Sequence, residues 1–339
     1  MTRLSASDAI GSWRDLRVAV TGAGGFVGSH LATRLVEEGA RVKALVHYNS
    51  RNDWGHLRSL PTQVVGKLEV LAGDIREPRA VRELVDGAEV VFHLAALIGI
   101  PYSYTSPTDV VQTNVLGTLN VLEAVRDART PRVVITSTSE VYGTAIYGPI
   151  DEVHPLQGQS PYSASKIGSD KLGECYYRSF GVPVVTVRPF NTFGPRQSTR
   201  AVIPTIITQA LTCDRIRLGS LEPKRDFTFV RDTVDGFVRC AATPACVGEV
   251  VNLGTGVEVS VGRVVELVQS ILGRSLPVEQ DDVRLRPAKS EVMRLLCNHE
   301  KASRLTGWEP KHTLESGLTE TIEWISKHLD QYQSRAYAI

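Results

Sequence analysis

Two hydroxyls and a carboxylate, those of Thr138, Ser139 and Glu140, stand at the end of an apolar run that begins at Arg132. A run of this kind is typical of a strand that is buried on both faces of a parallel sheet. Ligands of open α/β sheets bind just beyond the carboxyl ends of the strands, so we predict that these side chains contact a ligand. The alternative interpretation is that they only cap the following turn.

Tyr162 and Lys166 are four residues apart, a spacing that puts them on one face of a helix. The spacing is common by chance, and its position after the predicted fifth strand is what gives it weight. A phenol, whose reference pKa is about 10, is a poor base near neutrality, but an adjacent ammonium and an oxidised nicotinamide both favour the phenolate. Tyr162 would then take a hydroxyl proton while the same carbon gives a hydride to the cofactor, and Lys166 would also hold the cofactor ribose.

A glycine cluster is suited to binding such a cofactor. Gly22, Gly25 and Gly28 lie between an apolar run and an amphipathic segment. Glycines permit a tight turn and let backbone N–H groups and the positive end of a helix approach a pyrophosphate. The order of strand, glycine turn and helix therefore predicts a nucleotide-binding turn, which includes Phe26 and Val27.

The residues after the second and third predicted strands bear on the rest of the nucleotide. An acidic residue at the end of the second strand commonly binds a free ribose 2′-hydroxyl, and a basic one binds a 2′-phosphate. Here no carboxylate stands directly at the strand end, and the candidates are Asn49 and Arg51, so NAD and NADP both stay open. Asp74 and Ile75 are suited to the adenine amino group and ring, although Asp74 fits equally well as a helix N-cap.

The composition excludes several classes of protein. Among 339 residues, 38 Lys and Arg nearly balance 37 Asp and Glu, which argues against nucleic acid or a membrane surface as a partner. We see no secretory signal and no run of membrane-spanning length, and therefore expect a cytoplasmic protein. The five scattered cysteines form no CxxC pair, so neither a disulfide framework nor a metal site is predicted. His93, in an apolar strand, is predicted to be a hydrogen-bonded core residue.

Seven short β-rich runs must position these residues. Their nearly unbroken apolar character suits strands covered on both faces, and the lengths between the first six suit right-handed crossover helices. The pattern predicts an α/β fold with a doubly wound parallel sheet, the Rossmann fold. The runs are residues 16–22, 41–47, 67–73, 89–96, 132–139, 182–189 and 249–256.

Beyond residue 189 the alternation of strands and helices loosens. Helical patterns return at 260–273 and 313–329, and in the second of these Leu318, Ile322 and Ile325 share one side. We therefore predict two domains. The Rossmann domain would comprise residues 1–189 plus about 226–254, and a smaller mixed α/β domain would comprise about 190–225 plus 255–330.

Several motifs in a fixed order resemble one family. Besides the glycine pattern and YxxxK, they are "LAA" (94–96), "TNVLGTLNVLEAV" (113–125), "STSEVYG" (137–143), "RPFNTFGPRQ" (188–197) and "RDFTFVRDTVDGF" (225–237). From about residue 15 to 325 the chain resembles the extended short-chain dehydrogenase/reductase family, the NAD-dependent epimerases and dehydratases of nucleotide sugars. The resemblance implies a tightly bound NAD or NADP, with NAD favoured, and a nucleotide-diphosphate sugar bound by the smaller domain. It also implies a homodimer formed through residues 109–128 and the Tyr162 helix.

The resemblance also implies site residues that spacing alone does not identify. For the cofactor they are Leu94, Ala95, Ala96 and Thr113. For the substrate diphosphate they are Asn191, as a donor to a phosphate, and the cations Arg196, Arg225 and Arg286. Planar guanidinium groups suit phosphate oxygens, although each arginine fits equally well as a solvated surface charge.

The triplet Thr138, Ser139 and Glu140 separates branches of the family. By resemblance, 4-epimerases tend to carry a small unreactive residue at the position of Glu140, whereas 4,6-dehydratases and glucuronate decarboxylases carry a glutamate. The dTDP-glucose dehydratases usually have an aspartate at the position of Ser139, and the triplet here is closer to GDP-mannose dehydratases and UDP-glucuronate decarboxylases. Residues 48–55, 96–107, 284–295 and 305–318 are most similar to dehydratases of UDP- or GDP-linked N-acetylglucosamine in legionaminic-type pathways.

These residues imply a 4,6-dehydration. Tyr162 takes the C4 hydroxyl proton while Thr138 bonds the same oxygen, and Glu140 takes the C5 proton that the new ketone has acidified. The C6 hydroxyl then leaves as water, assisted by Glu140 or by Ser139 with a solvent molecule. The alternatives are a UDP-glucuronate decarboxylase, which needs a cation facing the C6 carboxylate, an NDP-sugar 4-epimerase, which has no use for a C5 base, and a non-enzymatic NAD(P)-binding protein.

Overall fold

The computed structural model describes residues 4–287 and 289–332. Its centre is a seven-stranded sheet in the order β11-β6-β5-β4-β1-β2-β3, and every pair of neighbours is parallel. Each of the seven predicted runs forms one strand, which confirms the doubly wound α/β fold. The strands are β1 (Arg17–Thr21), β2 (Arg41–His47), β3 (Leu68–Gly73), β4 (Val90–His93), β5 (Arg132–Thr136), β6 (Val184–Pro189) and β11 (Val250–Leu253).

The strand order reverses between β1 and β4. On one side of this pair lie β2 and β3, and on the other lie β5, β6 and β11. Ligands of such sheets bind beyond the carboxyl ends of the strands, where the order reverses. The residues that follow β1, β4 and β5 are therefore placed around one crevice.

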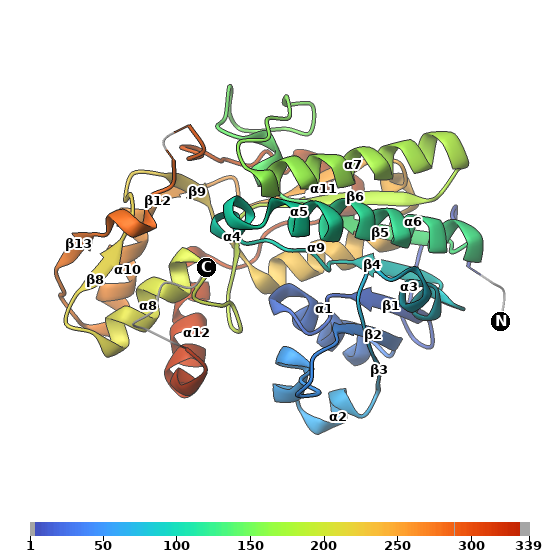
Figure 1. Ribbon diagram of the computed structural model, residues 1–339, viewed down its shortest axis with the longest axis horizontal. Helices are drawn as coiled ribbons and strands as arrows, with labels where there is room; N and C mark the ends of the chain where they lie inside the picture. The colour runs from blue at the N-terminus through green and yellow to red at the C-terminus, as the bar shows by residue number, and fades with distance from the viewer. Residues whose placement is uncertain (1–3, 288, 333–339) are drawn as a thin grey trace.

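Helices cover both faces of the sheet, as Figure 1 shows. One layer contains α1 (Phe26–Glu37) and α9 (Val230–Ala242), and the other contains α3 (Pro78–Val85), α6 (Gly117–Ala128) and α7 (Pro161–Phe180). A short helix α5 (Pro107–Val111) and a π-helical segment η2 (Gln112–Leu116) lead directly into α6.

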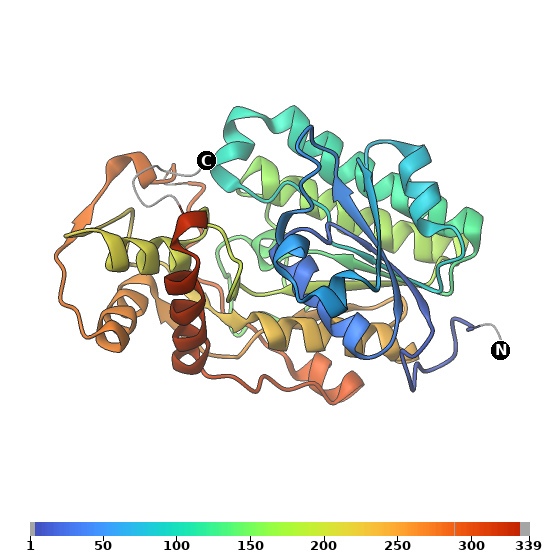
Figure 2. The ribbon, with the colours of Figure 1, turned by 90° about the horizontal axis from the view of Figure 1, so that it is seen from below.

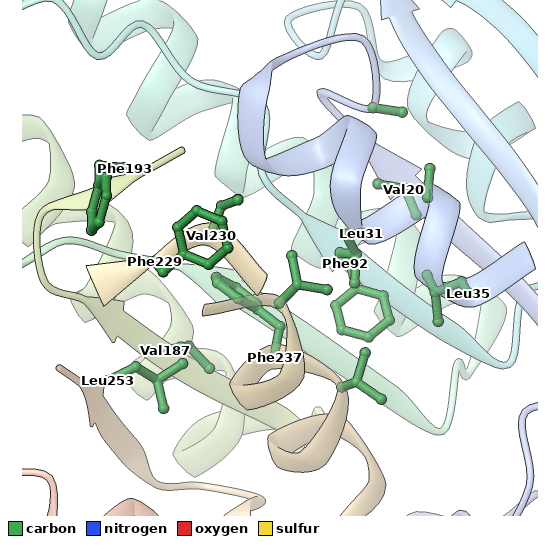
Figure 3. Packing of buried hydrophobic residues seen from close by; sticks show 14 of the residues in the cluster. Val20, Leu31, Leu35, Phe92, Val187, Phe193, Phe229, Val230, Phe237 and Leu253 are labelled. Carbon is green, nitrogen blue, oxygen red and sulfur yellow. The ribbon is translucent and has the colours of Figure 1, made fainter. Parts of the chain in front are cut away.

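The two covered faces explain why the strands lack a polar alternation. In β1, Val18 and Val20 pack into the cluster beneath α1 and α9, whereas Ala19 packs into the cluster beneath α3 and α6. Figure 3 shows the first cluster, where Leu31 of α1 and Phe237 of α9 meet side chains of the sheet. Both side-chain directions are buried, so both positions are apolar.

A second group of elements lies beyond the carboxyl ends of the strands. Helices α8 (Val202–Thr212), α10 (Val261–Leu272) and α12 (Leu314–Lys327) pack together, and Figure 2 shows α12 beside the other two. Alongside them β8 (Ile216–Leu218) pairs with β13 (Val278–Gln280), and β9 (Lys224–Asp226) pairs with β12 (Glu258–Ser260). The helices predicted at 260–273 and 313–329 are α10 and α12. The division into two domains at the predicted boundaries stays a prediction.

Shorter elements connect these parts. Near the crevice, β7 (Thr192–Phe193) pairs with β10 (Thr228–Phe229), while α11 (Glu300–Thr306) packs against α9 and β11. The others are α2 (Thr62–Val65), α4 (Ile100–Thr105), η1 (Gly55–Ser59), η3 (Ser139–Tyr142), η4 (Pro244–Cys246), η5 (Asp282–Arg284) and η6 (Leu329–Gln331).

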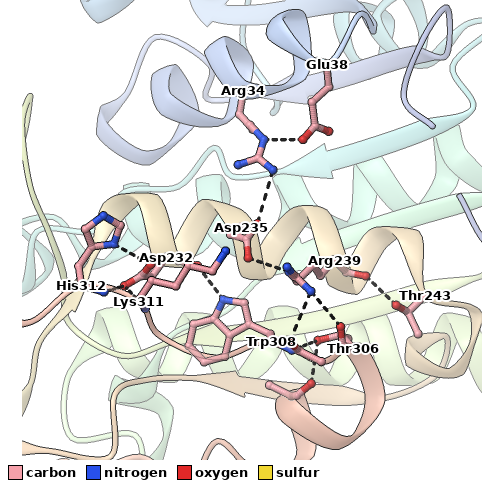
Figure 4. A network of polar contacts seen from close by, with 12 residues as sticks. Arg34, Glu38, Asp232, Asp235, Arg239, Thr243, Thr306, Trp308, Lys311 and His312 are labelled. Carbon is pink, nitrogen blue, oxygen red and sulfur yellow. Dashed lines mark hydrogen bonds and ion pairs between the residues drawn. The ribbon is translucent and has the colours of Figure 1, made fainter. Parts of the chain in front are cut away.

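Two carboxylates of α9 fix the C-terminal segment and the first helix (Figure 4). The buried Asp232 accepts hydrogen bonds from the backbone N–H groups of Lys311 and His312, at 3.1 and 3.0 Å, and contacts the His312 ring at 2.8 Å. Asp235 lies 3.5 Å from the guanidinium of Arg34 on α1. Helix α9 therefore links the segment before α12 to the helix that follows the glycine turn.

Candidate active site

A cleft of about 790 Å³ opens at the carboxyl ends of the strands. Most of the site residues predicted from the sequence line this cleft, and they come both from the ends of the sheet and from the second group of elements. Those that line it are Gly22, Gly25, Phe26, Val27, Gly28, Asn49, Leu94, Ala95, Ala96, Thr138, Ser139, Glu140, Tyr162, Asn191, Arg225 and Arg286. The predicted residues outside its lining are Arg51, Asp74, Ile75, Thr113, Lys166 and Arg196.

The glycine turn leaves room only for backbone. Gly22 has a φ of +68°, and a Cβ there would lie 2.7 Å from the backbone nitrogen of Ala95. A Cβ on Gly28 would lie 2.1 Å from the carbonyl oxygen of Gly22. Helix α1 begins directly after Gly25, and no side chain of the described residues caps its first turn. The free N–H groups and the close approach of the turn to the cleft fit the pyrophosphate of a dinucleotide such as NAD(P).

The loop after β2 is organised by Asn49. Its Oδ1 accepts from the backbone N–H groups of Arg51 and Asp53, at 3.1 and 3.0 Å, and its Nδ2 donates to the carbonyl oxygen of Asp53 at 2.8 Å. Arg51 is exposed outside the cleft, whereas Asp53 lines it. Asp53 is not identifiable from the sequence, because a cofactor-binding carboxylate is expected at the strand end and only the fold of this loop brings a later carboxylate into the cleft.

Asp74 and Ile75 are engaged elsewhere. The Asp74 carboxylate accepts from Arg76 at 2.6 Å, and this hydrogen bond lowers the pKa of Asp74 below its usual range. Ile75 is buried in the core beneath α3 and α6 and packs against Gly117. The N-cap of α3 is Glu77, so the alternative interpretation of Asp74 as the helix N-cap is wrong. An adenine contact for Asp74 and Ile75 stays a prediction.

A buried histidine fixes the segment that follows β4. The Thr21 Oγ1 accepts from the backbone N–H groups of Leu94 and Ala95, both at 3.0 Å, and contacts the ring of His93 at 2.9 Å. The other ring nitrogen of His93 lies 3.0 Å from Thr118. Burial lowers the pKa of His93 to about 3, so the ring is neutral. His93 is the hydrogen-bonded core residue predicted, and it holds residues 94–96 at the cleft wall. The half-buried Thr113 lies in η2, outside the cleft lining.

Thr138 both caps a turn and lines the cleft. Its side chain accepts from the backbone N–H of Glu140 at 3.2 Å, which starts η3 and sets the direction of the next side chains. Ser139 and Glu140 are buried and line the cleft with it. Within residues 4–287 and 289–332 no cation lies within 4.0 Å of the Glu140 carboxylate, which lines the cleft, although the charge of Arg225 acts on it at longer range.

A capping box at the start of α7 positions Tyr162. The Ser160 Oγ accepts from the backbone N–H of Ser163 at 3.1 Å, and the Ser163 Oγ accepts from that of Ser160 at 2.9 Å. Burial raises the pKa of Tyr162, a hydrogen bond with Thr138 lowers it, and the charge of Glu140 raises it. The phenol, the Thr138 hydroxyl and the Glu140 carboxylate therefore share one corner of the cleft. Ionisation of the phenol there requires a nearby positive charge.

Lys166 lies one helical turn after Tyr162, behind the cleft wall. Its Nζ donates to the carbonyl oxygen of Thr136 at the end of β5, at 2.6 Å. Burial lowers the pKa of Lys166 to about 8, and the charge of Asp170 opposes this shift. The ammonium therefore keeps its proton near neutral pH, and it lies on the same face of α7 as Tyr162.

Arg225 and Arg286 meet at one carboxylate in the cleft. Glu291 accepts from Arg225 at 3.2 Å and from Arg286 at 3.5 Å. Burial lowers the pKa of Arg225, and the charge of Glu140 raises it, so the guanidinium also interacts with Glu140. Asn191 lines the cleft too, with its Oδ1 buried and unpartnered among the described residues. Glu291 is not among the residues predicted from the sequence, and its position five residues after Arg286 is the signal that could have identified it.

Arg196 is placed away from the other two arginines. Its guanidinium donates to Ser29 of α1 at 3.2 Å and lies 5.6 Å from the ring centre of Trp324 on α12. It therefore ties the loop after β7 to the first and last long helices. A direct contact between Arg196 and a substrate phosphate stays a prediction.

Two kinds of feature are absent from the part of the chain that the structure describes. Residues 4–287 and 289–332 contain no helix with the length and apolar character needed to cross a membrane. Over the same ranges, no three or more His, Cys, Asp and Glu side chains cluster in a way that could hold a metal ion.

A glycine turn and a helix N-terminus at one cleft, with Tyr162 in its lining and Lys166 directly behind it, define an NAD(P)-binding short-chain dehydrogenase/reductase. The model of a family described as GDP-mannose 4,6 dehydratase matches residues 19–321, and the chain belongs to this family of epimerases and dehydratases of nucleotide sugars. The resemblance noted in the sequence is thus confirmed at the level of the family.

Relatives within the family carry out different reactions. The chain is 32% identical over 317 residues to a UDP-glucose 4-epimerase of Mycolicibacterium smegmatis, covering 91% of this chain and 98% of the relative. It is 31% identical over 331 residues to a dTDP-glucose 4,6-dehydratase of Xanthomonas campestris pv. campestris, covering 90% and 92%. The solved structure of TunA, an NAD-dependent NDP-hexosamine 5,6-dehydratase of tunicamycin biosynthesis, has a TM-score of 0.81 and 30% identity, covering 93% and 99%. Identity at this level leaves the reaction to be argued from the site.

Proposed function

We propose that this protein is a nucleotide-sugar 4,6-dehydratase, which converts an NDP-hexose or NDP-N-acetylhexosamine into a 4-keto-6-deoxy sugar. The observation that carries the proposal is the shared corner of Tyr162, Thr138 and Glu140, in which a carboxylate without an ion pair among the described residues lies beside the phenol. A bound NAD(P), held by residues 22–28 and 94–96, would supply the oxidant by accepting a hydride from C4 and returning it to C6.

The first half of the reaction, oxidation at C4, depends on two residues of α7, Tyr162 and Lys166. Tyr162 takes the proton of the C4 hydroxyl, and Thr138 hydrogen-bonds the same oxygen. Burial disfavours the phenolate, so its formation depends on the Lys166 ammonium and on the positive charge of the oxidised cofactor. This arrangement supports oxidation of a sugar hydroxyl at neutral pH.

The second half, the loss of water, depends on Glu140 and Ser139 of η3. A ketone at C4 acidifies the C5 proton, and the Glu140 carboxylate removes it. The C6 hydroxyl then leaves as water, assisted by the protonated Glu140 or by Ser139 with a solvent molecule. An epimerase needs no base at C5, so the position of Glu140 favours dehydration over 4-epimerisation.

The substrate diphosphate would be held by Arg225, Arg286 and Asn191. Both guanidinium groups line the cleft and meet at Glu291, and a guanidinium fork pairs well with phosphate oxygens. We favour a hexosamine as the sugar because segments of the chain resemble hexosamine dehydratases, and because TunA, an NDP-hexosamine 5,6-dehydratase, has a similar structure. A homodimer through α5, η2, α6 and α7 is part of the same proposal.

We also propose that the cofactor is NAD. Both Asp53 and Arg51 are exposed in the loop after β2, but only Asp53 lines the cleft. A carboxylate suits a free ribose 2′-hydroxyl and repels a 2′-phosphate. Binding constants of the cofactor-free protein for NAD and NADP test this proposal, and tighter binding of NADP would contradict it.

A nucleotide-uronate decarboxylase is the second candidate. It shares the Tyr162 and Glu140 chemistry but needs a cation facing the C6 carboxylate, and the buried Arg225 interacts with Glu140 and is suited to that role. A panel of UDP- and GDP-linked hexoses, N-acetylhexosamines and UDP-glucuronate separates the two. Loss of one water from a hexose or hexosamine supports the dehydratase. Release of carbon dioxide from UDP-glucuronate, with no dehydration, supports the decarboxylase.

A further inference from the structure

The proposed reaction depends on two elements that are separate in the chain. Helix α7 carries Tyr162 and Lys166, and η3 carries Glu140. The base that removes the C5 proton must keep a fixed position relative to the phenol that acts at C4, since small errors in position slow reactions strongly. The structure contains a buried polar network that joins these two elements behind the cleft.

The first link of this polar network is an ion pair between α7 and β6. Both the Nε and Nη2 of Arg188 lie close to Oδ2 of Asp170, at 3.0 and 2.9 Å, and the two side chains are only 4% and 3% exposed. Asp170 follows Lys166 by one helical turn and Tyr162 by two, so all three share one face of α7. Arg188 is therefore fixed relative to the residues that act on the C4 hydroxyl.

The same guanidinium then reaches η3. Arg188 Nη1 donates to the hydroxyl of Tyr142 at 2.8 Å, and its carbon lies 4.9 Å from the centre of the Tyr142 ring. The Tyr142 hydroxyl donates onward to Oδ1 of Asn252 on β11, at 2.7 Å. Tyr142 is fully buried and stands two residues after Glu140 in the single turn of η3.

These contacts hold both elements rigidly. A buried, hydrogen-bonded ion pair tolerates the loss of neither partner, because the remaining charge would be left without compensation. Burial also raises the pKa of Tyr142, so its hydroxyl stays neutral and can both donate and accept. This polar network therefore joins all four elements, α7, β6, η3 and β11, through side-chain contacts.

We propose that Arg188 and Tyr142 are positioning residues that keep Glu140 in register with Tyr162, so that removal of the C5 proton follows oxidation at C4. This inference rests on the proposed dehydratase function. The two residues touch neither substrate nor cofactor in this scheme and act only through η3. Their loss slows the elimination selectively and leaves the oxidation at C4 in place.

The test is Tyr142→Phe, which removes only the hydroxyl. In single-turnover experiments with NAD-loaded enzyme and a nucleotide sugar that the wild type dehydrates, reduced nicotinamide should form near the wild-type rate. Product should form about 10- to 100-fold more slowly, so that reduced cofactor accumulates. The matched control is Tyr176→Phe, on the part of α7 distant from the cleft. This change also removes a tyrosine hydroxyl that is hydrogen-bonded to another side chain, that of Glu123 on α6.

A crystal structure of Tyr142→Phe gives a readout that does not depend on activity. A changed separation between Glu140 and Tyr162, with α7 itself unmoved, supports the inference. Unchanged positions of both residues, or equal slowing of both half-reactions, would overturn it. Should Tyr142→Phe fail to fold, Arg188→Lys, which keeps the cation but loses the fork, takes its place with the same expectations. A wild type that dehydrates no nucleotide sugar refutes the proposed function instead, and the crystal structure still decides the positioning.

Discussion

Glu140 is the residue whose replacement separates the two halves of the proposed reaction. Glu140→Gln keeps the shape of the side chain but removes the base, and general bases contribute about 100- to 10,000-fold to a rate. We expect water loss to slow by that factor while oxidation at C4 continues, which rapid-mixing absorbance of the reduced cofactor would show. A variant that dehydrates at the wild-type rate would exclude Glu140 as the C5 base.

Burial of Lys166, which we propose acts with Tyr162, should lower the stability of the fold. Its pKa falls from 10.5 to about 8 on burial, which corresponds to about 3 kcal/mol of unfavourable free energy when the side chain is charged in both the folded and unfolded states. Lys166→Met should therefore raise the free energy of unfolding at pH 7 by about 1–3 kcal/mol while abolishing activity. Denaturant unfolding measures this change.

The sign of the pH dependence follows from the same shift. Between about pH 8 and 10.5 the unfolded chain holds the Lys166 proton that the folded chain has released, so the wild type gains stability relative to Lys166→Met as the pH rises. The advantage of the variant should be full below pH 8 and should shrink above it. A difference that is constant with pH would mean that the lysine is not charged and buried as described.

The glycine turn is the element whose geometry is most restricted. A Cβ at Gly28 would meet the carbonyl oxygen of Gly22 at 2.1 Å, so Gly28→Ala must shift the start of α1. We expect purified Gly28→Ala to retain no NAD(P), as measured by the cofactor released on denaturation. Gly11→Ala is the control, because a Cβ at Gly11 has no atom within 4 Å. Full cofactor retention in Gly28→Ala would contradict the placement of the pyrophosphate.

Elements and site residues differed in how far the sequence could predict them. The seven strands were predictable because a strand buried on both faces must be an unbroken apolar run, as in β1 and β5. Residues that directly follow strands, such as Thr138 and Glu140, were predictable because strand ends converge at the cleft. Arg196 could not be placed, since its partners Ser29 and Trp324 are distant in sequence and only the folded chain brings them together.

At the scale of the whole molecule, exposed apolar side chains lie on the elements through which we propose that a homodimer forms. Val111 and Leu116 are 45% and 49% exposed on the α5 and η2 segment, and Phe180 is 53% exposed at the end of α7. Leu116→Glu should dissociate the proposed homodimer, as measured by sedimentation. Val153→Glu, at an 83% exposed position on a separate loop, is the control. A wild type that sediments as a monomer would refute the dimer.

The most direct test of the central claim follows an isotope through the whole reaction. The enzyme would be given a nucleotide sugar carrying deuterium at C4, and the product would be examined by mass spectrometry and NMR. The 4,6-dehydration proposed for the corner of Tyr162 and Glu140 predicts deuterium in the C6 methyl group of a 4-keto product. A methyl group without deuterium, or deuterium found again at C4, would contradict it.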